Sequence, residues 1–251
     1  MTGVQTCALP ISSLVPHFGT IRTETVGTLG KKDYRIYFEQ DGKKISPWHK
    51  IPAFVSKDVV NMVCEIPRGT NAKMEICTTQ KFNPIKQDLN KDGSLRYMKH
   101  GNVLNHYGAV PQTWEDLFEK DSIVGIPGDN DPIDIIDISK IKAARGEVVQ
   151  IKPFCALALL DGGETDWKII GINVKDPLAP LINSAKDVEK TVDEIREWYR
   201  VYKVAEGKKL NKYAYGGKAF NQKSTMDIIN ETHLQYSKLK LTQKKLSKLA
   251  L

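Results

Sequence analysis

The chain has few cysteines, and they are scattered. Its four cysteines include no C-x-x-C spacing, standing at Cys7, Cys64, Cys77 and Cys155. The sequence therefore predicts neither a zinc site nor a disulfide framework. Proteins that keep their cysteines as thiols occupy reducing compartments, so we expect a cytoplasmic location. No apolar run approaches the roughly 18 residues that a membrane-spanning helix needs, and we expect no membrane partner.

The excess of basic charge is confined to one end of the chain. The net charge is +7, but residues 237–251 hold five lysines and no acid, which leaves 32 basic and 30 acidic residues elsewhere. A nearly neutral body lacks the basic surface typical of nucleic-acid binding, and the terminal lysines lack the interleaved aromatic residues of single-strand binders. We expect no nucleic-acid partner. The basic tail is interpreted as a helix extension, with a contact for an anionic surface as the alternative.

Length and composition favour one domain. The 251 residues, 41% of them hydrophobic, suffice to bury one core, which we place at residues 16–236. Residues 1–15 are expected to be an unrelated leader, disordered or artefactual, because they have neither the basic start nor the apolar centre of a secretory signal. Residues 237–251 form the basic C-terminal tail.

Hydrophobic patterning predicts strands first and helices later. Strands are expected near 59–66, 73–79, 95–98, 133–138, 147–160 and 167–174. One helix opens at Ser184, where Asp187 stands three residues on in a capping-box pattern. A second helix is expected at roughly 218–236, with Met226, Ile229 and His233 facing inward. Periodicity alone therefore predicts an α+β fold.

Three carboxylates fall within six residues at Asp129, Asp131 and Asp134, after the turn-forming segment 125–128 of sequence Gly-Ile-Pro-Gly. Like charges this close repel one another unless a cation neutralises them, and hard oxygen ligands at this density suit Mg²⁺. Pro132 stiffens the backbone between them. An acidic surface turn without a metal is the alternative.

A calcium-binding EF-hand does not fit either acidic segment. Counted from Asp129, the fifth, sixth and twelfth positions of the loop are Ile133, Asp134 and Lys140, where calcium loops need Asp or Asn, Gly and Glu. The segment 88–93 matches the first half of such a loop better, but its twelfth position is Lys99. We interpret it as a hairpin turn.

Further acids and lysines recur at the spacing of β-strands. Lys73 and Glu75 are two residues apart and so share one strand face, as do Asp166 and Lys168. Asp161 and Asp166 flank a Gly-Gly turn, which would bring them near each other in a hairpin. Each pair alone is typical of an ordinary solvent-facing strand. Together with the acidic turn, they indicate a cavity that holds both cations and a polyanion.

The chain resembles the soluble family I inorganic pyrophosphatases, in their eukaryotic form, from about Gly19 to Tyr236. The motifs that carry the resemblance lie at 65–68, 70–75, 105–109, 111–116, 128–134, 160–168, 176–180 and 198–203. The resemblance implies a mainly β fold, a five-stranded OB-like barrel with flanking α-helices. It also implies a homodimer whose catalytic domain, 16–236, hydrolyses pyrophosphate to phosphate with several Mg²⁺ ions.

The resemblance also implies a role for each site residue. The acids matching Asp129, Asp134 and Asp166 hold the tightly bound metal, and the acid matching Asp131 is the general base. Acids completing the sites for further ions and waters match Glu65, Glu75 and Asp161. Phosphate-binding residues match Lys73, Arg96, Tyr107, Lys168, Tyr202 and Lys203.

One position departs from the family pattern, since Val103 stands where the family usually has a tyrosine. Two alternatives to pyrophosphate hydrolysis stay open. One is a catalytically silent polyanion-binding or metal-binding protein on the same fold, and the other is a phosphohydrolase for a larger phosphate ester. Retention of Lys73, Arg96, Asp131, Tyr202 and Lys203 argues against a silent protein.

Overall fold

The computed structural model describes residues 20–249 of the chain, so the leader expected at 1–15 lies outside the described residues. Twelve strands within this part form two sheets. The smaller sheet runs in the order β1 (Ile21–Val26), β2 (Arg35–Gln40), β7 (Ile85–Gln87) and β6 (Met74–Ile76), with β3 (Lys43–Ile45) also paired to β2. In β2, Ile36 and Phe38 alternate into the core, as a half-buried strand requires.

The larger sheet closes into a barrel of five strands. Its path is β12 (Lys212–Tyr213), β10 (Val148–Asp161), β11 (Glu164–Asn173), β9 (Asp134–Asp137), β8 (His106–Ala109), β5 (Val59–Ile66) and β4 (Phe54–Ser56). The pairing of β10 with β5 closes β10, β11, β9, β8 and β5 into a ring, which leaves β12 and β4 outside it. The five-stranded OB-like barrel predicted above is confirmed.

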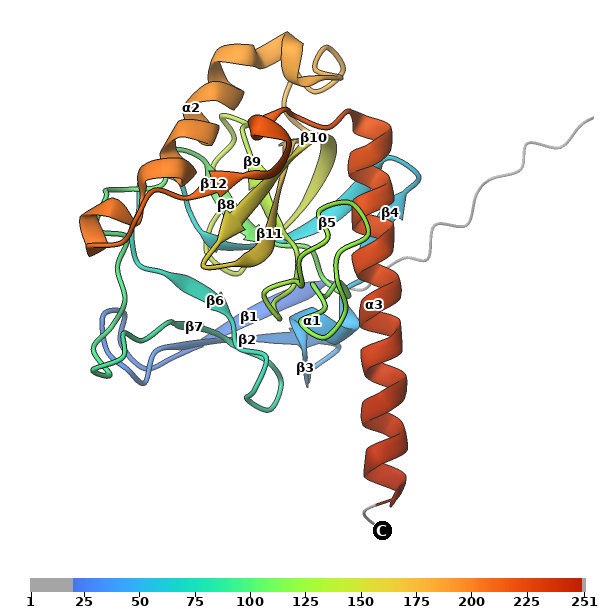
Figure 1. Ribbon diagram of the computed structural model, residues 1–251. Helices are drawn as coiled ribbons and strands as arrows, with labels where there is room; N and C mark the ends of the chain where they lie inside the picture. The colour runs from blue at the N-terminus through green and yellow to red at the C-terminus, as the bar shows by residue number, and fades with distance from the viewer. Residues whose placement is uncertain (1–19, 250–251) are drawn as a thin grey trace, which may run out of the picture.

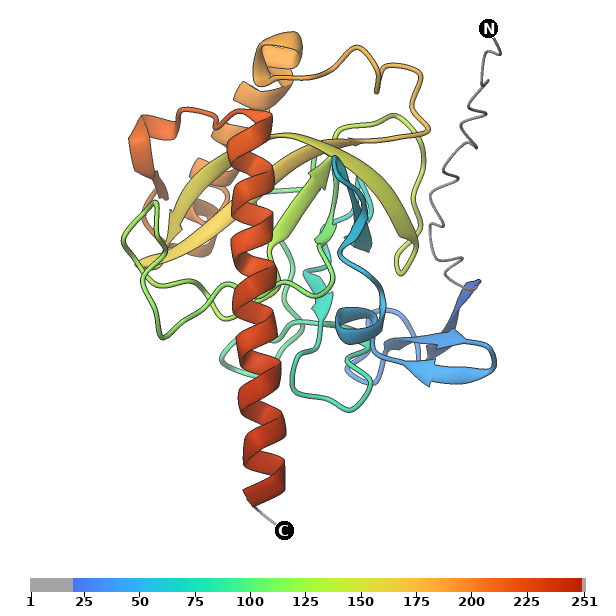
Figure 2. The ribbon, with the colours of Figure 1, turned by 90° about the vertical axis from the view of Figure 1, so that its right-hand side faces the viewer.

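Two helices flank the barrel on different sides (Figures 1 and 2). The helix α2 (Glu189–Val201) buries Val192, Ile195 and Trp198 in the same core cluster as the smaller sheet. The helix α3 (Gln222–Leu249) contributes Met226 and Ile229 to a second cluster with other barrel residues. A single-turn helix, α1 (Pro47–Lys50), begins at Ser46, whose hydroxyl accepts a hydrogen bond from His49 N–H at 3.0 Å.

The predicted helices are present, with shifted ends. The capping box forms, since the Asp187 carboxylate accepts a hydrogen bond from Ser184 N–H at 2.9 Å, but a 3₁₀ turn over Ala185–Val188 precedes α2. The helix α3 begins at Gln222 and not at 218, and it continues without a break past Tyr236. Figure 2 shows its last turns projecting beyond the body, which agrees with the interpretation of the tail as a helix extension. A separate tail from residue 237 stays a prediction.

The strand predicted at 95–98 is wrong. Leu95 pairs only with Leu89, and Tyr97 only with Ala72, so each forms an isolated bridge and no ladder builds up. The strands β1 and β3 were not predicted, because most of their residues are exposed and give little apolar alternation. The strand β2 was not predicted either, although its Ile36 and Phe38 alternate into the core. Among the described residues, none of the helices combines the length and apolar character needed to cross a membrane.

Candidate active site

One cavity collects nearly all of the charged residues singled out in the sequence. Its volume, open mouth included, is about 990 Å³. Twelve of the thirteen predicted site residues line it, namely Lys73, Glu75, Arg96, Tyr107, Asp129, Asp131, Asp134, Asp161, Asp166, Lys168, Tyr202 and Lys203. The exception is Glu65.

The acidic loop is held in shape by backbone contacts. Asn130 has a φ of +75°, and the Asp129 carboxylate accepts a hydrogen bond from Asp131 N–H at 3.0 Å. Residue 115 lies alongside the loop, because Glu115 N–H donates to Asp131 O and Asn130 N–H donates to Glu115 O. Gly128 packs so closely that a Cβ there would lie 2.5 Å from the Glu115 carbonyl carbon. The loop therefore needs glycine at this position.

Several acids of the cavity have a raised pKa. Removal from water, together with repulsion by Asp131, raises the pKa of Asp129 to about 7. Asp131 is exposed at the open part of the cavity. Partial removal from water by the cavity walls, together with repulsion by Glu75, raises its pKa to about 7. Burial raises the pKa of Asp166 well above its usual range. The loop and its neighbours thus favour a bound proton or a bound cation.

Lys168 is the main internal cation for these acids. Only 3% of its side chain is exposed, and Nζ donates to Asp166 Oδ1 at 2.5 Å and to Asp134 Oδ2. For Asp134, the desolvation that would raise the pKa is outweighed by the attraction of Lys168, and the pKa is lowered. The predicted common face of Asp166 and Lys168 is confirmed.

The other basic residues stand around the same space. Lys73 Nζ lies 3.7 Å from Glu75 and 5.5 Å from the centre of the Tyr107 ring, while Lys168 Nζ lies 5.6 Å from that ring centre. Tyr107 is therefore flanked by two lysines. The contact of Lys73 with Glu75 agrees with the predicted shared strand face.

Two further basic side chains of the cavity, Arg96 and Lys203, are paired with acids. Arg96 donates to Asp88 at 2.8 Å, and Lys203 donates to Asp161, which also accepts a hydrogen bond from Tyr202 Oη at 2.9 Å. For Asp161, desolvation is outweighed by the hydrogen bond from Lys203, and the pKa is lowered. Each phosphate-binding candidate on this wall is thereby fixed by a carboxylate.

Glu65 lies behind the cavity wall. Its side chain is buried, and its carboxylate accepts a hydrogen bond from Ile76 N–H at 2.6 Å. Burial raises its pKa well above the usual range, with Lys73 acting in the opposite direction. The structure places Glu65 beneath the strand that carries Glu75, and its part in an ion site stays a prediction.

Sequence reasoning missed Glu115, which lies directly behind the acidic loop. One of its oxygens accepts a hydrogen bond from Trp167 N–H at 3.0 Å, and the other, Oε2, is buried with no partner in the described part of the chain. A carboxylate oxygen of Glu115 lies within 4.8 Å of one from Asp129 and one from Asp166. Its place in the motif 111–116 was the only signal available.

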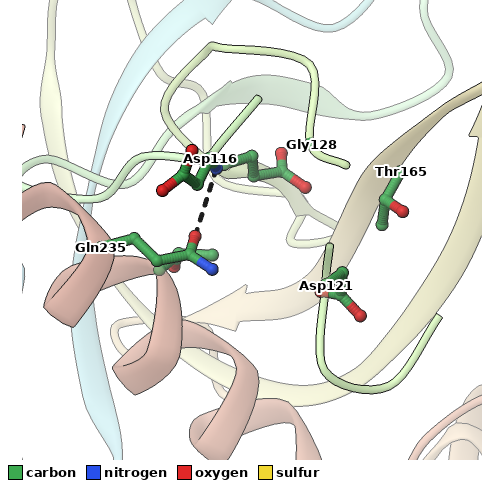
Figure 3. A pocket seen from close by; sticks show the side chains of 7 residues that line it. Asp116, Asp121, Gly128, Thr165 and Gln235 are labelled. Carbon is green, nitrogen blue, oxygen red and sulfur yellow. Dashed lines mark hydrogen bonds between the residues drawn. The ribbon is translucent and has the colours of Figure 1, made fainter. Parts of the chain in front are cut away.

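A small pocket adjoins Glu115 on the side of α3. Figure 3 shows Gln235 of α3 accepting a hydrogen bond from Asp116 N–H, at 3.2 Å, beside Gly128 and Thr165. Through this hydrogen bond, Gln235 ties the backbone next to Glu115 to α3. Asp88 and Tyr199 are two further cavity residues that were not assigned to the site.

The donor set fits a hard divalent cation. Every potential ligand is a carboxylate oxygen, one Glu115 oxygen lies within 4.8 Å of an oxygen of Asp129 and of Asp166, and burial raises the pKa of Glu115 well above its usual range. Such a cluster is stabilised by a cation of high charge, and oxygen donors without sulfur or imidazole suit Mg²⁺, Ca²⁺ or Mn²⁺.

Comparison with known proteins identifies the family. The family model for inorganic pyrophosphatase matches residues 62–237. An inorganic pyrophosphatase of Candida glabrata is 44% identical over 227 residues, which is 86% of this chain and 79% of the relative. A chloroplastic soluble inorganic pyrophosphatase of Chlamydomonas reinhardtii is 42% identical over 237 residues, which is 92% of this chain and 84% of the relative. The chain belongs to the inorganic pyrophosphatase family.

Solved structures agree with this identification. The type I inorganic pyrophosphatase of Toxoplasma gondii superposes with a TM-score of 0.83 at 39% identity, covering 88% of this chain and all of that one. A truncated vacuolar soluble pyrophosphatase of Trypanosoma cruzi, solved in complex with PPi, gives a TM-score of 0.85 at 35% identity over 96% of this chain and 98% of that one. Both the family and the fold expected from the sequence are confirmed.

Gly128→Ala is expected to weaken metal binding by this pyrophosphatase. The added Cβ would lie too close to the backbone of Glu115. Either Glu115 or the segment that carries Asp129 would therefore have to move. Calorimetric titration of the variant with Mg²⁺ should show at least a tenfold rise in Kd, since ligand positions must hold to a few tenths of an ångström.

Gly125→Ala is the matched control. Gly125 lies in the same loop at a φ of +77° but has no atom within 4 Å of the added carbon. Backbone strain should cost about 1 kcal/mol of stability without touching the ligands. Equal metal affinity in the two variants would refute the close-packing argument.

Proposed function

We propose a residue-level mechanism by which this member of the family hydrolyses inorganic pyrophosphate to two orthophosphates. The observation that carries it is the charge arrangement of one cavity. Carboxylates gather on the loop 129–134, and the same cavity is lined by Tyr107 of β8, Lys168 of β11, Lys73 just before β6, Arg96 between β7 and β8, and Tyr202 and Lys203 just after α2. Such a site can bind cations and a tetravalent anion together.

We infer that Asp129, Asp134 and Asp166 hold the most tightly bound Mg²⁺, and that Glu65, Glu75 and Asp161 complete the sites for further ions and waters. The oxygen-only donor set supports Mg²⁺. Bound divalent ions supply positive charge that lowers the pKa of the attacking water and neutralises the phosphates. Glu115, one oxygen of which lies within 4.8 Å of an oxygen of Asp129 and of Asp166, supports these two ligands from behind.

Asp131 is the proposed general base. Its side chain extends into the open part of the cavity, whereas Asp134 is engaged by Lys168. The water oxygen forms a bond to one phosphorus as the bridging P–O bond breaks, and Asp131 receives the water proton. The backbone hydrogen bond to Asp129 keeps this carboxylate on a fixed turn.

The phosphates are held by Lys73, Arg96, Tyr107, Lys168, Tyr202 and Lys203. Lysines act as point charges, and the arginine fork can bind a phosphate bidentately. Little covalent work is asked of the protein in phosphoanhydride hydrolysis, so positioning and charge stabilisation dominate. The ion pairs of Arg96 with Asp88 and of Lys203 with Asp161 support this role, because they hold the two basic side chains at the cavity.

We also propose a cytoplasmic homodimer as the working form. Cys64, Cys77 and Cys155 are buried free thiols, which suits a reducing compartment. Sedimentation of the purified chain would test the dimer. A single species at the monomer mass would contradict it.

Activity is expected to depend on added Mg²⁺. Phosphate release from pyrophosphate should vanish in excess EDTA and return with Mg²⁺, because the crowded carboxylates need a cation before a polyanion can bind. Ca²⁺ should inhibit, since its larger and looser shell positions water poorly. Full turnover in excess EDTA would rule out the metal-activated water. Absence of phosphate release under all conditions would favour a silent binding protein.

Asp131→Asn and Asp129→Asn are expected to fail in different ways. Loss of the base should lower kcat by on the order of 10²-fold or more while leaving pyrophosphate binding nearly intact. Loss of the ligand should instead raise the Mg²⁺ concentration needed for half-maximal rate. If both variants reach normal kcat at saturating Mg²⁺, Asp131 is a ligand and not the base.

Lys73→Met is expected to lower kcat/KM for pyrophosphate by about 2–4 kcal/mol of transition-state binding at saturating Mg²⁺. Lys73 makes only a 3.7 Å contact with Glu75, so its charge is available to substrate. Lys168→Met should lower kcat/KM by a similar amount. This substitution also removes the ion-pair partner of Asp134 and Asp166. Its metal-free form should therefore melt at a lower temperature.

The control for the lysine variants is Lys44→Met, which removes a surface ion pair with Glu24 outside the cavity. Exposed pairs contribute about 0–1 kcal/mol, so kcat/KM should not change. Near-normal kcat/KM in Lys73→Met would return this lysine to a purely structural pair with Glu75.

A further inference from the structure

Tyr199 is a buried residue of α2 that also stands in the cavity wall. It lines the cavity from α2, one turn before Tyr202. Its other side borders a small hollow lined by Val103, Ile136 and Ile195. The Tyr199 ring thus separates the apolar hollow at Val103 from the charged cavity.

The Tyr199 ring is fixed by aromatic neighbours. It stacks on Tyr107, with ring centres 6.2 Å apart and planes inclined by 28°, and it meets Trp198 edge-on at 4.8 Å and Tyr202 edge-on at 5.7 Å. Aromatic contacts of this kind restrict ring rotation and translation. A hydroxyl carried by such a ring occupies a defined place.

The surroundings of the ring are those of a phosphate-binding wall. Lys168 Nζ lies 5.3 Å from its centre, close to the 5.6 Å that separates Lys168 from the Tyr107 ring. Tyr199 is only 6% exposed, yet its hydroxyl is not among the fully enclosed polar atoms that lack a partner in the described part of the chain, and no hydrogen bond from it to a protein group is found there. The hydroxyl is therefore open to accessible space, and the cavity that Tyr199 lines is where a phosphate oxygen can accept its hydrogen bond.

We propose that Tyr199 is a substrate-contacting residue whose hydroxyl donates a hydrogen bond to pyrophosphate on the Lys168 side of the cavity. This inference rests on the proposed pyrophosphate hydrolysis. Val103 offers only an apolar side chain beside the ring, so Tyr199 adds a third phenol to the cavity wall that Tyr107 and Tyr202 also line. Burial raises the pKa of Tyr199 well above its usual range, which keeps the hydroxyl protonated as a donor.

A purely structural role for Tyr199 makes a different prediction. If the ring only fills space, phenylalanine keeps every stacking contact and substrate affinity is unchanged. Tyr199→Phe therefore separates the two roles, because it deletes the hydroxyl and leaves the ring. Tyr236→Phe is the matched control, since Tyr236 is similarly buried but its hydroxyl pairs with His49 Nδ1 outside the cavity.

The experiment measures phosphate release and the affinity for imidodiphosphate, a non-hydrolysable pyrophosphate analogue, at saturating Mg²⁺. Tyr199→Phe should lower kcat/KM by about 10–100-fold and weaken analogue binding, as expected for a lost hydrogen bond to a charged group, with little change in melting temperature. Tyr236→Phe should keep kcat/KM and the affinity for imidodiphosphate within threefold of the unmodified chain. Values within threefold for Tyr199→Phe would overturn the inference.

A second arm restores a phenol from the neighbouring position. Val103→Tyr alone should change kcat by less than about tenfold, because the hydrogen bond is already made. If the unmodified chain releases no phosphate, the proposed function fails and not this inference alone.

Discussion

The structure depends on the balance of charge around Lys168. Its ammonium group lies between Asp134 and Asp166, and without it two buried carboxylates would face each other with no cation. One lysine cannot neutralise the whole cluster, however, since Asp129, Asp131 and Glu115 add further negative charge. The protein alone is therefore left with excess negative charge that metal ions can neutralise, and a bound metal then attracts phosphate.

The barrel supplies this balance through strand register. Lys168 of β11 lies directly opposite Asp134 of the parallel strand β9. On the same strand, Trp167 and Ile169 point away into the core cluster that also contains α3. A shift of one residue would exchange the faces, burying Lys168 under α3 and exposing Trp167, so the core holds the site in register.

Local spacing allowed much of the site to be predicted, because strand alternation puts residues two apart on one face. Lys73 with Glu75, and Asp166 with Lys168, were predicted in this way and are confirmed. The OB-like barrel came from family motifs and not from periodicity. Glu115 was missed because its position depends on a contact with Trp167, which is far from it in sequence. Asp88 was missed because its contact with Arg96 forms across a loop that strand alternation does not describe. No spacing rule contains that information.

Tyr199 shows a further limit of pattern reading. Helical periodicity places it in the core, and the structure agrees that it is buried, yet one edge of the core is also the cavity wall. A buried core residue can therefore also contact a ligand where the core borders a cavity. Here the aromatic cluster around Trp198 ends against Lys168, so the packing that stabilises α2 also fixes the groups that meet the substrate. A rigid wall of this kind lowers the cost of ordering at the reaction step, which favours placing substrate contacts on α2 and not on a loop.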